Sequence, residues 1–160
     1  MRLGDDVSAF ECRYPELDDW LRLRARAAEG RSARTYVVAA SDRVVGYYCL
    51  AAGSIGREEL PTAKLRRNQP SDVPVIVLGR LAVDLAFERH GVGSGLLKDA
   101  FRRCLTAADT IGVRAIVVHA IDEGAAQFYE KLKFKPLNAG PLTLFVPLET
   151  AAAAAVDIRS

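Results

Sequence analysis

The sequence contains few of the residues that most often build metal centres or disulfide frameworks. Of its 160 residues, three are cysteines and two are histidines. The cysteine count is odd and the spacing does not match that of metal ligands, which favours reduced thiols and a cytoplasmic location. Two histidines, His90 and His119, are too few for a multi-histidine metal site. We therefore expect no metal cofactor.

Long apolar runs are also missing. No stretch approaches the ~18 apolar residues that a membrane-spanning helix needs, so no membrane partner is expected. The N-terminal residues MRLGDDVSAFEC lack the charged-then-apolar order of a signal peptide. Half of the residues are hydrophobic and 26% are charged, as in globular proteins. The length predicts one domain over residues 1–150, followed by a low-complexity tail at 151–160.

The net charge of +2 does not select a partner, but the basic residues are clustered. For any single cluster a solvated surface is the simpler interpretation. Several clusters on a nearly neutral chain permit an anionic ligand larger than a metabolite. The residues that we consider for phosphate contacts are Arg22, Arg24, Arg26, Lys64, Arg66, Arg67 and, if it faces the site, Arg80. Because Arg80 lies in an apolar segment, a structural ion pair is a serious alternative for it.

Hydrophobic periodicity predicts an α/β fold with a central mixed sheet and helices on both faces. The central strand–helix–strand order implies parallel strands, whereas the two β-rich runs before it indicate an antiparallel hairpin. Residues 53–72 are typical of a polar connection with a short helix around 58–67. The predicted helices cover residues 15–28, 93–111 and 123–132, and the predicted strands cover 34–40, 43–52, 73–84, 113–120 and 141–149.

Three glycines lie at the turn from the buried strand to the helix, in FERHGVGSGLLKDA at residues 87–100. A helix start presents unpaired N–H groups and a partial positive charge, and glycine lets the backbone approach a pyrophosphate closely. Alone, such a turn is as often ordinary turn chemistry. A P-loop would need Gly-Lys-Ser/Thr, and a dinucleotide fingerprint would need a different glycine spacing at the start of a βαβ unit. The sequence fits neither.

From LGRLAVD to QFYEKLKF, the chain resembles the GNAT family, the GCN5-related N-acetyltransferases. The family motif Q/R-x-x-G-x-G/A aligns with residues 88–93, which implies acetyl-CoA as the cofactor. Glu88 stands where the family has Gln or Arg, so we expect its carboxylate to point away from the pyrophosphate, with Arg89 or His90 nearer. Gly91 and Gly93 are then the working glycines, and Gly95 is a close-packing residue. The cofactor-binding residues that the resemblance implies are Leu81, Ala82, Val83, Glu88, Arg89, His90, Gly91, Val92, Gly93, Ser94, Asp122 and Phe128.

A second segment, DEGAAQFYEKLKF, is similar to the family's N-x-x-A-x-x-F-Y-x-x-x-G-F. Asp122 replaces the Asn and Lys133 replaces the helix-ending Gly, so we expect the end of this helix to be capped differently. The resemblance implies that Tyr129 is the catalytic general acid. A phenol with an ordinary pKa of about 10 stays protonated and can donate to a departing thiolate of pKa about 8.5. From spacing alone, Tyr129 would be interpreted as an aromatic residue that packs beside Phe128.

Over nearly the whole chain, segments such as FECRYPELDDWLRLRA and RVVGYYCLAAGSI resemble the toxins of GNAT toxin–antitoxin modules. This resemblance implies acetylation of the α-amino group of aminoacyl-tRNA, a block of translation, a ribbon-helix-helix antitoxin and a homodimer. An α-amino group has an ordinary pKa near about 8, so a strong base is not required. The alternatives are a GNAT acetyltransferase of a small-molecule or protein amine, and a non-catalytic acyl-CoA-binding module.

Overall fold

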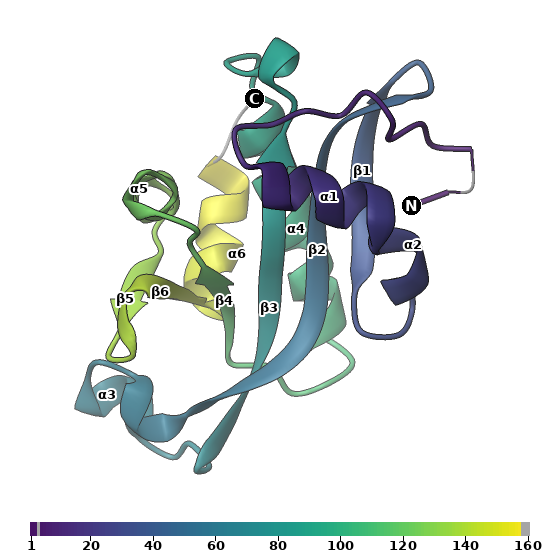
Figure 1. Cartoon of the computed structure of the whole chain (residues 1–160). Helices are drawn as coiled ribbons and strands as arrows, with labels where there is room; N and C mark the ends of the chain where they lie inside the picture. Colours follow the sequence, from purple (N-terminus) through teal and green to yellow (C-terminus); the bar gives the residue numbers. More distant parts are fainter. Residues whose placement is uncertain (3, 158–160) are drawn as a thin grey trace. The chain divides into compact units, whose positions relative to one another are not determined.

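The computed structural model describes residues 1–2 and 4–157. Six strands form one sheet in the order β1-β2-β3-β4-β6-β5 (Figure 1). The pair β3–β4 is parallel, and β1–β2, β4–β6 and β5–β6 are antiparallel, which confirms the predicted mixed sheet. In chain order the elements are α1 (Pro15–Leu23), α2 (Ala25–Ala28), β1 (Arg34–Ala40), β2 (Arg43–Gly56), the 3-10 helix η1 (Arg57–Glu59), α3 (Ala63–Arg66), β3 (Asp72–Val83), the 3-10 helix η2 (Leu85–Phe87), α4 (Val92–Ala108), β4 (Ala115–His119), α5 (Glu123–Lys131), β5 (Lys135–Leu137), β6 (Gly140–Pro147) and α6 (Leu148–Asp157).

The chain forms two compact units. The first contains Met1–Ala51 and Gly79–Ala100, and the second contains Ala52–Leu78 and Phe101–Asp157. The elements β2, β3 and α4 begin in one unit and end in the other. No helix in the described part of the chain is long and apolar enough to cross a membrane.

A β-bulge in β2 shapes the core of the first unit. Val38 of β1 lies opposite Gly46 and Ala39 lies opposite Val44, so Val45 has no opposite residue. The extra residue reverses the alternation of side chains and places Val44 in the same core cluster as Tyr47. Leu21 of α1 joins this cluster, so α1 covers that face of the strands (Figure 1).

The other face of β2 is covered by the start of α4, which Figure 1 draws behind the strands. A Cβ atom at Gly46 would lie 2.9 Å from Cγ1 of Val92 and 3.1 Å from Cδ1 of Leu96. Only glycine at this position allows so close an approach of helix and strand. The first turn of α4 therefore rests directly on the β2 backbone.

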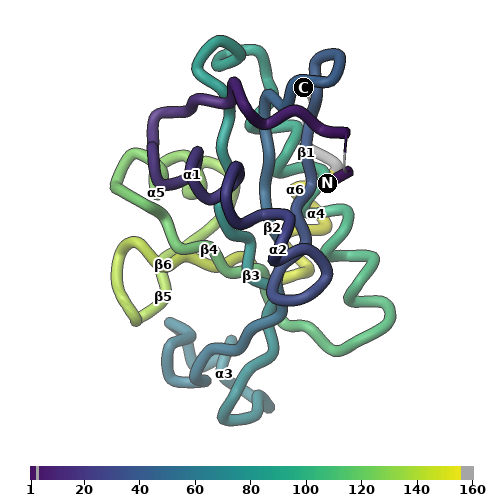
Figure 2. Tube along the Cα trace, turned by 45° about the vertical axis from the view of Figure 1, so that its right-hand side comes forward, coloured from purple at the N-terminus to yellow at the C-terminus, as the bar shows by residue number. Residues whose placement is uncertain are grey.

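The N-terminal segment joins the first unit through backbone contacts. Figure 2 shows it running beside the turn between β1 and β2, where Asp6 pairs with Arg43. The Asp6 N–H donates to the Asp42 carbonyl at 2.8 Å, and Val44 N–H donates back to the Asp6 carbonyl at 2.8 Å. The segment that leads into α1 is thereby fixed to the sheet.

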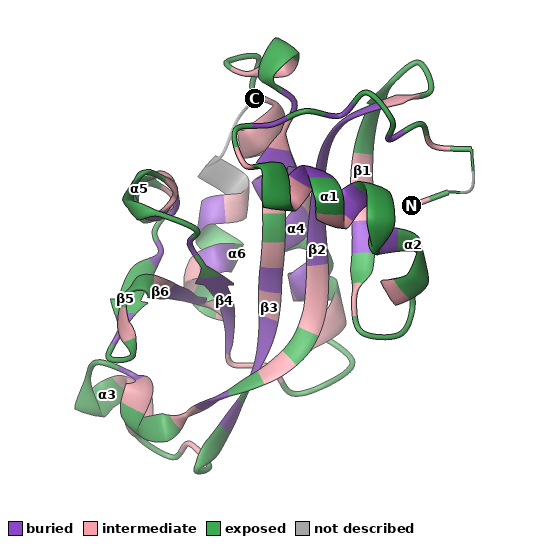
Figure 3. Cartoon of the chain, in the orientation of Figure 1, coloured by how far each residue is buried: buried purple, intermediate pink, exposed green. Residues whose placement is uncertain are grey.

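The second unit is built around β4, which is buried except at its last residue (Figure 3). Its register with β3 runs from Val75 opposite Ala115 to Leu78 opposite Val118. Helix α6 contributes Ala151 and Ala154, both buried. The last residues of the predicted low-complexity tail, 158–160, lie outside the described residues.

The structure corrects four features of the predicted elements. The helix expected over 15–28 is broken at Arg24 (φ −124°), and a separate turn places Ala25 in the core. The helix expected to reach residue 111 ends at 108. The short strand β5 was not predicted.

The fourth error concerns residues 53–56, which belong to β2 and not to a connection. Glycine disfavours strands in general, but here a Cβ at Gly53 would lie 2.8 Å from Cγ2 of Val77. The neighbouring strand β3 therefore leaves no room for a larger residue at position 53.

Candidate functional site

The loop between η2 and α4 has the backbone of an anion-binding turn. Arg89 (φ +63°) and Gly91 (φ +79°) both lie in the left-handed region. The Gly91 carbonyl accepts the Gly95 N–H at 3.0 Å and so opens the first turn of α4, whose leading N–H groups have no partner within the helix. A Cβ at Gly91 would meet no atom within 4 Å. This open space beside free N–H groups fits a pyrophosphate.

Gly95 does not have the packing role predicted for it. A Cβ there would also meet no atom within 4 Å outside the backbone of its own helix. The prediction that Gly95 is a close-packing residue is therefore wrong, and the close approach of α4 is made at Gly46.

Asp84, at the end of β3, anchors the segment before the loop, and sequence reasoning missed it. The residue is buried, and its carboxylate accepts the N–H groups of Ala86 at 2.9 Å and Glu11 at 3.1 Å and a hydrogen bond from Nη2 of Arg43 at 3.1 Å. Burial raises the pKa of this carboxyl, but the three hydrogen bonds outweigh burial and hold the pKa below its ordinary value. One sequence feature could have indicated this role: Asp84 stands between a strand and a helical turn, a position at which aspartate often caps the helix N-terminus.

Glu88, whose position in the family motif is unusual, forms a bidentate ion pair with Arg13. Arg13 Nε donates to Oε1 at 2.7 Å and Nη2 donates to Oε2 at 2.9 Å. This hydrogen bonding holds the pKa of Glu88 below its ordinary value. The two residues are 75 positions apart, so no local pattern could have revealed the pair.

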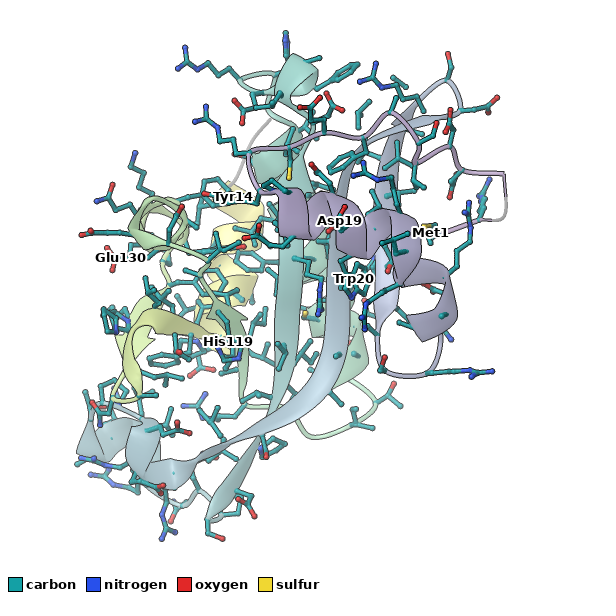
Figure 4. All side chains as sticks on the ribbon, in the orientation of Figure 1. Met1, Tyr14, Asp19, Trp20, His119 and Glu130 are labelled. Atoms are coloured by element: carbon teal, nitrogen blue, oxygen red, sulfur yellow. The ribbon has the colours of Figure 1, made fainter. Side chains whose placement is uncertain are left out.

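The end of β3 carries the residues Leu81, Ala82 and Val83, of which Ala82 is buried and the other two are half-buried. Arg80, just before them, has a left-handed backbone (φ +57°) within the strand. Its guanidinium carbon lies 4.4 Å from the centroid of Trp20, labelled in Figure 4.

Trp20 itself stacks on Tyr47, with ring centroids 6.1 Å apart and planes 7° apart. The sequence left a structural ion pair open for Arg80. Arg80 forms no ion pair with any described residue, and its guanidinium instead makes the cation–π contact with Trp20. The stack keeps an exposed cation at a fixed place next to the strand end.

The other predicted phosphate-contacting residues are divided between the two units. In the first, Arg22 donates to the Phe10 carbonyl at 2.6 Å and Arg26 donates to the Asp5 carbonyl at 2.8 Å, so both side chains also hold the N-terminal segment. Arg24 is exposed. In the second unit, the basic residues on and after α3 are Lys64 and Arg67, both exposed, and Arg66, half-buried.

Tyr129 lies on α5, in the second unit, and is 7% exposed. Its ring centroid is 5.4 Å from those of Phe128 and Phe134, both in edge-on contacts. Asp122 caps the N-terminus of α5 by accepting the Ala125 N–H at 2.8 Å, so an aspartate performs the capping expected of an asparagine.

The C-terminus of α5 corrects a prediction. Phe134 N–H donates to the Tyr129 carbonyl at 3.2 Å and Lys133 N–H donates to the Glu130 carbonyl at 3.2 Å, the two bonds of a Schellman cap. Lys133 adopts φ +80°, the conformation that glycine takes without strain. We expected a different kind of cap because lysine replaces the glycine. The structure instead shows the usual cap, with Lys133 held in the left-handed region.

We therefore expect Lys133→Gly to stabilise the protein by about 0.5–1 kcal/mol. The change relieves left-handed backbone strain of about 1–2 kcal/mol, but glycine also raises the entropy of the unfolded chain, which offsets part of this gain. Thermal denaturation should show a melting temperature about 1–4 °C higher. Lys131→Gly, the same change at the last residue of α5, should instead destabilise by about 0.5 kcal/mol, because glycine loses more backbone freedom in a helix. Equal destabilisation by both changes would show that Lys133 is not strained.

The three cysteines are not candidate nucleophiles. Cys12, Cys49 and Cys104 are buried and free. Burial raises the pKa of Cys12 to about 12, of Cys49 to about 11 and of Cys104 to about 12, so all three are thiols at neutral pH. In the part of the chain that the structure describes, no group of three or more His, Cys, Asp and Glu side chains could hold a metal ion.

Comparison with known proteins identifies the family. The acetyltransferase (GNAT) domain model matches residues 31–136, and the chain therefore belongs to the GNAT acetyltransferase family. A tRNA-acetylating toxin of Mycobacterium tuberculosis (strain ATCC 25618 / H37Rv) is 46% identical over 152 residues, which is 94% of this chain and 90% of the relative.

Two solved structures are similar over most of their length. AtaT complexed with acetyl-methionyl-tRNAfMet superposes with a TM-score of 0.87 at 26% identity, over 95% of this chain and 93% of that one. A mutant AtaT bound to the C-terminus of the antitoxin AtaR and acetyl-CoA gives a TM-score of 0.78 at 26% identity, over 92% and 88%. Both likenesses confirm the predicted GNAT fold.

Proposed function

We propose that this protein is a toxin that transfers an acetyl group from acetyl-CoA to the α-amino group of aminoacyl-tRNA and so blocks translation. The observation that carries the proposal is the extent of the likeness to the tRNA-acetylating toxin, which covers 94% of this chain. That likeness includes α1 and the β1–β2 hairpin, which lie outside the acetyl-CoA motifs and give the resemblance its specificity.

The acetyl donor is held, in this proposal, by the loop at the start of α4 and by the end of β3. Gly91 and its neighbours offer backbone N–H groups to the pyrophosphate, and the open space at Gly91 accommodates it. Residues 81–83 offer strand N–H and carbonyl groups to the pantetheine arm. The bound donor supplies an activated acetyl thioester.

Tyr129 supplies the proton that the departing thiolate needs. A phenol with an ordinary pKa of about 10 stays protonated at cellular pH, so Tyr129 holds a proton that the sulfur can accept as the bond between the acetyl carbon and the sulfur breaks. The likeness of residues 122–134 to the family motif supports this role, and the ring contacts with Phe128 and Phe134 restrict how Tyr129 can turn.

The acceptor is an amine attached to a polyanion. A useful fraction of an aminoacyl α-amine is neutral at cellular pH, since its ordinary pKa is near about 8, and water or a backbone carbonyl suffices as the base. Exposed basic residues, Arg24 and Arg80 in one unit and Lys64 and Arg67 in the other, offer contacts to phosphate groups.

We propose a ribbon-helix-helix antitoxin as a protein partner, and a homodimer as the working form. The binding of AtaT to the C-terminus of AtaR supports an antitoxin. Both finer assignments come from the resemblance to the toxin modules.

An acetyl-transfer assay tests the acceptor class. Labelled acetyl-CoA is supplied with charged tRNA, the same tRNA after deacylation, a lysine-containing peptide and a small primary amine. We expect label on charged tRNA alone, and a KM for charged tRNA that rises steeply with salt because phosphate contacts release counterions. Labelling of the peptide or small amine but not of charged tRNA would instead support the general acetyltransferase alternative. Binding of acetyl-CoA without transfer to any amine would support a non-catalytic module.

A further inference from the structure

We propose that Arg13 is a positioning residue for acetyl-CoA: it turns the Glu88 carboxylate away from the pyrophosphate loop and cancels its charge. The inference rests on the proposed use of that loop. It assigns a role to a residue outside both acetyltransferase motifs and explains how the chain tolerates an acid at the first position of the loop motif.

The geometry of the pair is that of a strong, orienting contact. Two parallel hydrogen bonds, at 2.7 and 2.9 Å, join the guanidinium fork of Arg13 to both carboxylate oxygens of Glu88. Such a pair fixes the direction of the carboxylate as well as its distance. Both oxygens of Glu88 are therefore occupied by Arg13.

Arg13 is itself held at this place by the chain around it. One residue earlier, the Cys12 N–H donates to Oδ1 of the buried Asp18 in α1 at 2.9 Å. Two residues earlier, the Glu11 backbone forms two hydrogen bonds with the segment before the loop: its N–H donates to Asp84 Oδ2 at 3.1 Å and its carbonyl accepts Leu85 N–H at 2.9 Å. The segments 11–13 and 84–88 thus run side by side, and the ion pair joins them at the start of the loop.

The charges explain why the contact matters. Glu88 lies three residues before Gly91, where an unpaired carboxylate would repel a pyrophosphate. With Arg13 in place, the pair is neutral, and the exposed Arg89 adds one positive charge to the loop. The pKa of Glu88 lies below its ordinary value, so the carboxylate is negatively charged at neutral pH and a positive charge beside it is always required.

The test is acetyl-CoA binding by isothermal titration calorimetry, which needs no catalytic turnover. We expect Arg13→Ala to raise the Kd about tenfold at low salt, and by less as salt screens the exposed Glu88 carboxylate. In the same background Glu88→Gln removes the repulsion, so the double variant should bind within about threefold of the wild type. Arg114→Ala, which breaks the comparable Arg114–Glu149 pair in the second unit, is the control and should leave the Kd unchanged.

Two results would overturn the inference: an unchanged Kd in folded Arg13→Ala, or a double variant that binds as weakly as Arg13→Ala. The Arg13 side chain is 62% exposed, so the variant is expected to fold, and circular dichroism checks this. Failure of the wild type to bind acetyl-CoA would instead overturn the proposed function. If the wild type binds acetyl-CoA and Arg13→Ala binds it with the same Kd, only the role of Arg13 is overturned.

Discussion

Replacing Tyr129 by phenylalanine is expected to lower the rate of acetyl transfer about 10²–10⁴-fold, the usual loss when a general acid is removed. The substitution deletes the hydroxyl but keeps the ring, so the edge-on contacts with Phe128 and Phe134 persist. We expect kcat to fall while the Kd for acetyl-CoA stays within a few-fold of the wild type, because the proton is needed only as the thiolate departs. Single-turnover acetylation of charged tRNA measures the change.

Tyr36→Phe provides the matched control. Tyr36 lies on β1 and stacks on Tyr48 with ring centroids 5.2 Å apart, so this change also removes one hydroxyl and keeps one ring contact. Its acetylation rate should stay close to that of the wild type. If Tyr129→Phe is folded and equally active, Tyr129 is a packing residue and another group, or water, protonates the thiolate.

Gly91→Ala is expected to weaken acetyl-CoA binding about 10- to 100-fold. Gly91 has φ +79°, where a side chain strains the backbone by about 1–2 kcal/mol. The added methyl group also enters the space that the pyrophosphate would use. Losing one charge-assisted hydrogen bond to a backbone N–H costs about 1.5–3 kcal/mol, which corresponds to the expected change in Kd.

Gly112→Ala is the comparison for this second variant. Gly112 is exposed, its φ lies outside the left-handed region and a Cβ there would meet no atom within 4 Å, so acetyl-CoA binding should not change. Equal affinity in Gly91→Ala and Gly112→Ala, measured by calorimetry on folded protein, would show that the loop does not hold the pyrophosphate.

The elements that could be predicted from the sequence are those with strong periodic patterns. The apolar run at residues 73–84 and the stripe that starts at Leu96 indicated β3 and α4, and their order implied the parallel pair with β4. The missed features depend on tertiary contacts. The break at Arg24 is marked by no neighbouring glycine or proline in the sequence, and the small space at Gly53 is set by Val77 on the neighbouring strand.

The same distinction holds at the site. The glycine loop and Tyr129 belong to short motifs and can be read from local sequence. The Arg13–Glu88 pair joins residues 75 positions apart, and the contact of Arg80 with Trp20 joins residues on a strand and a helix. Lys133 shows a third case, because its left-handed conformation is imposed by the cap of α5 and contradicts its own preference.

The most direct test of the proposed activity is mass spectrometry of the aminoacyl-adenosine released by nuclease from charged tRNA after incubation with the protein and acetyl-CoA. We expect a product heavier by one acetyl group, with fragments that place the acetyl on the α-nitrogen, and none of this product with Tyr129→Phe over the same brief incubation. The set of tRNAs that carry it would also identify the preferred amino acid. Aminoacyl-adenosine of unchanged mass, released after incubation with folded protein and intact acetyl-CoA, would contradict the proposed activity.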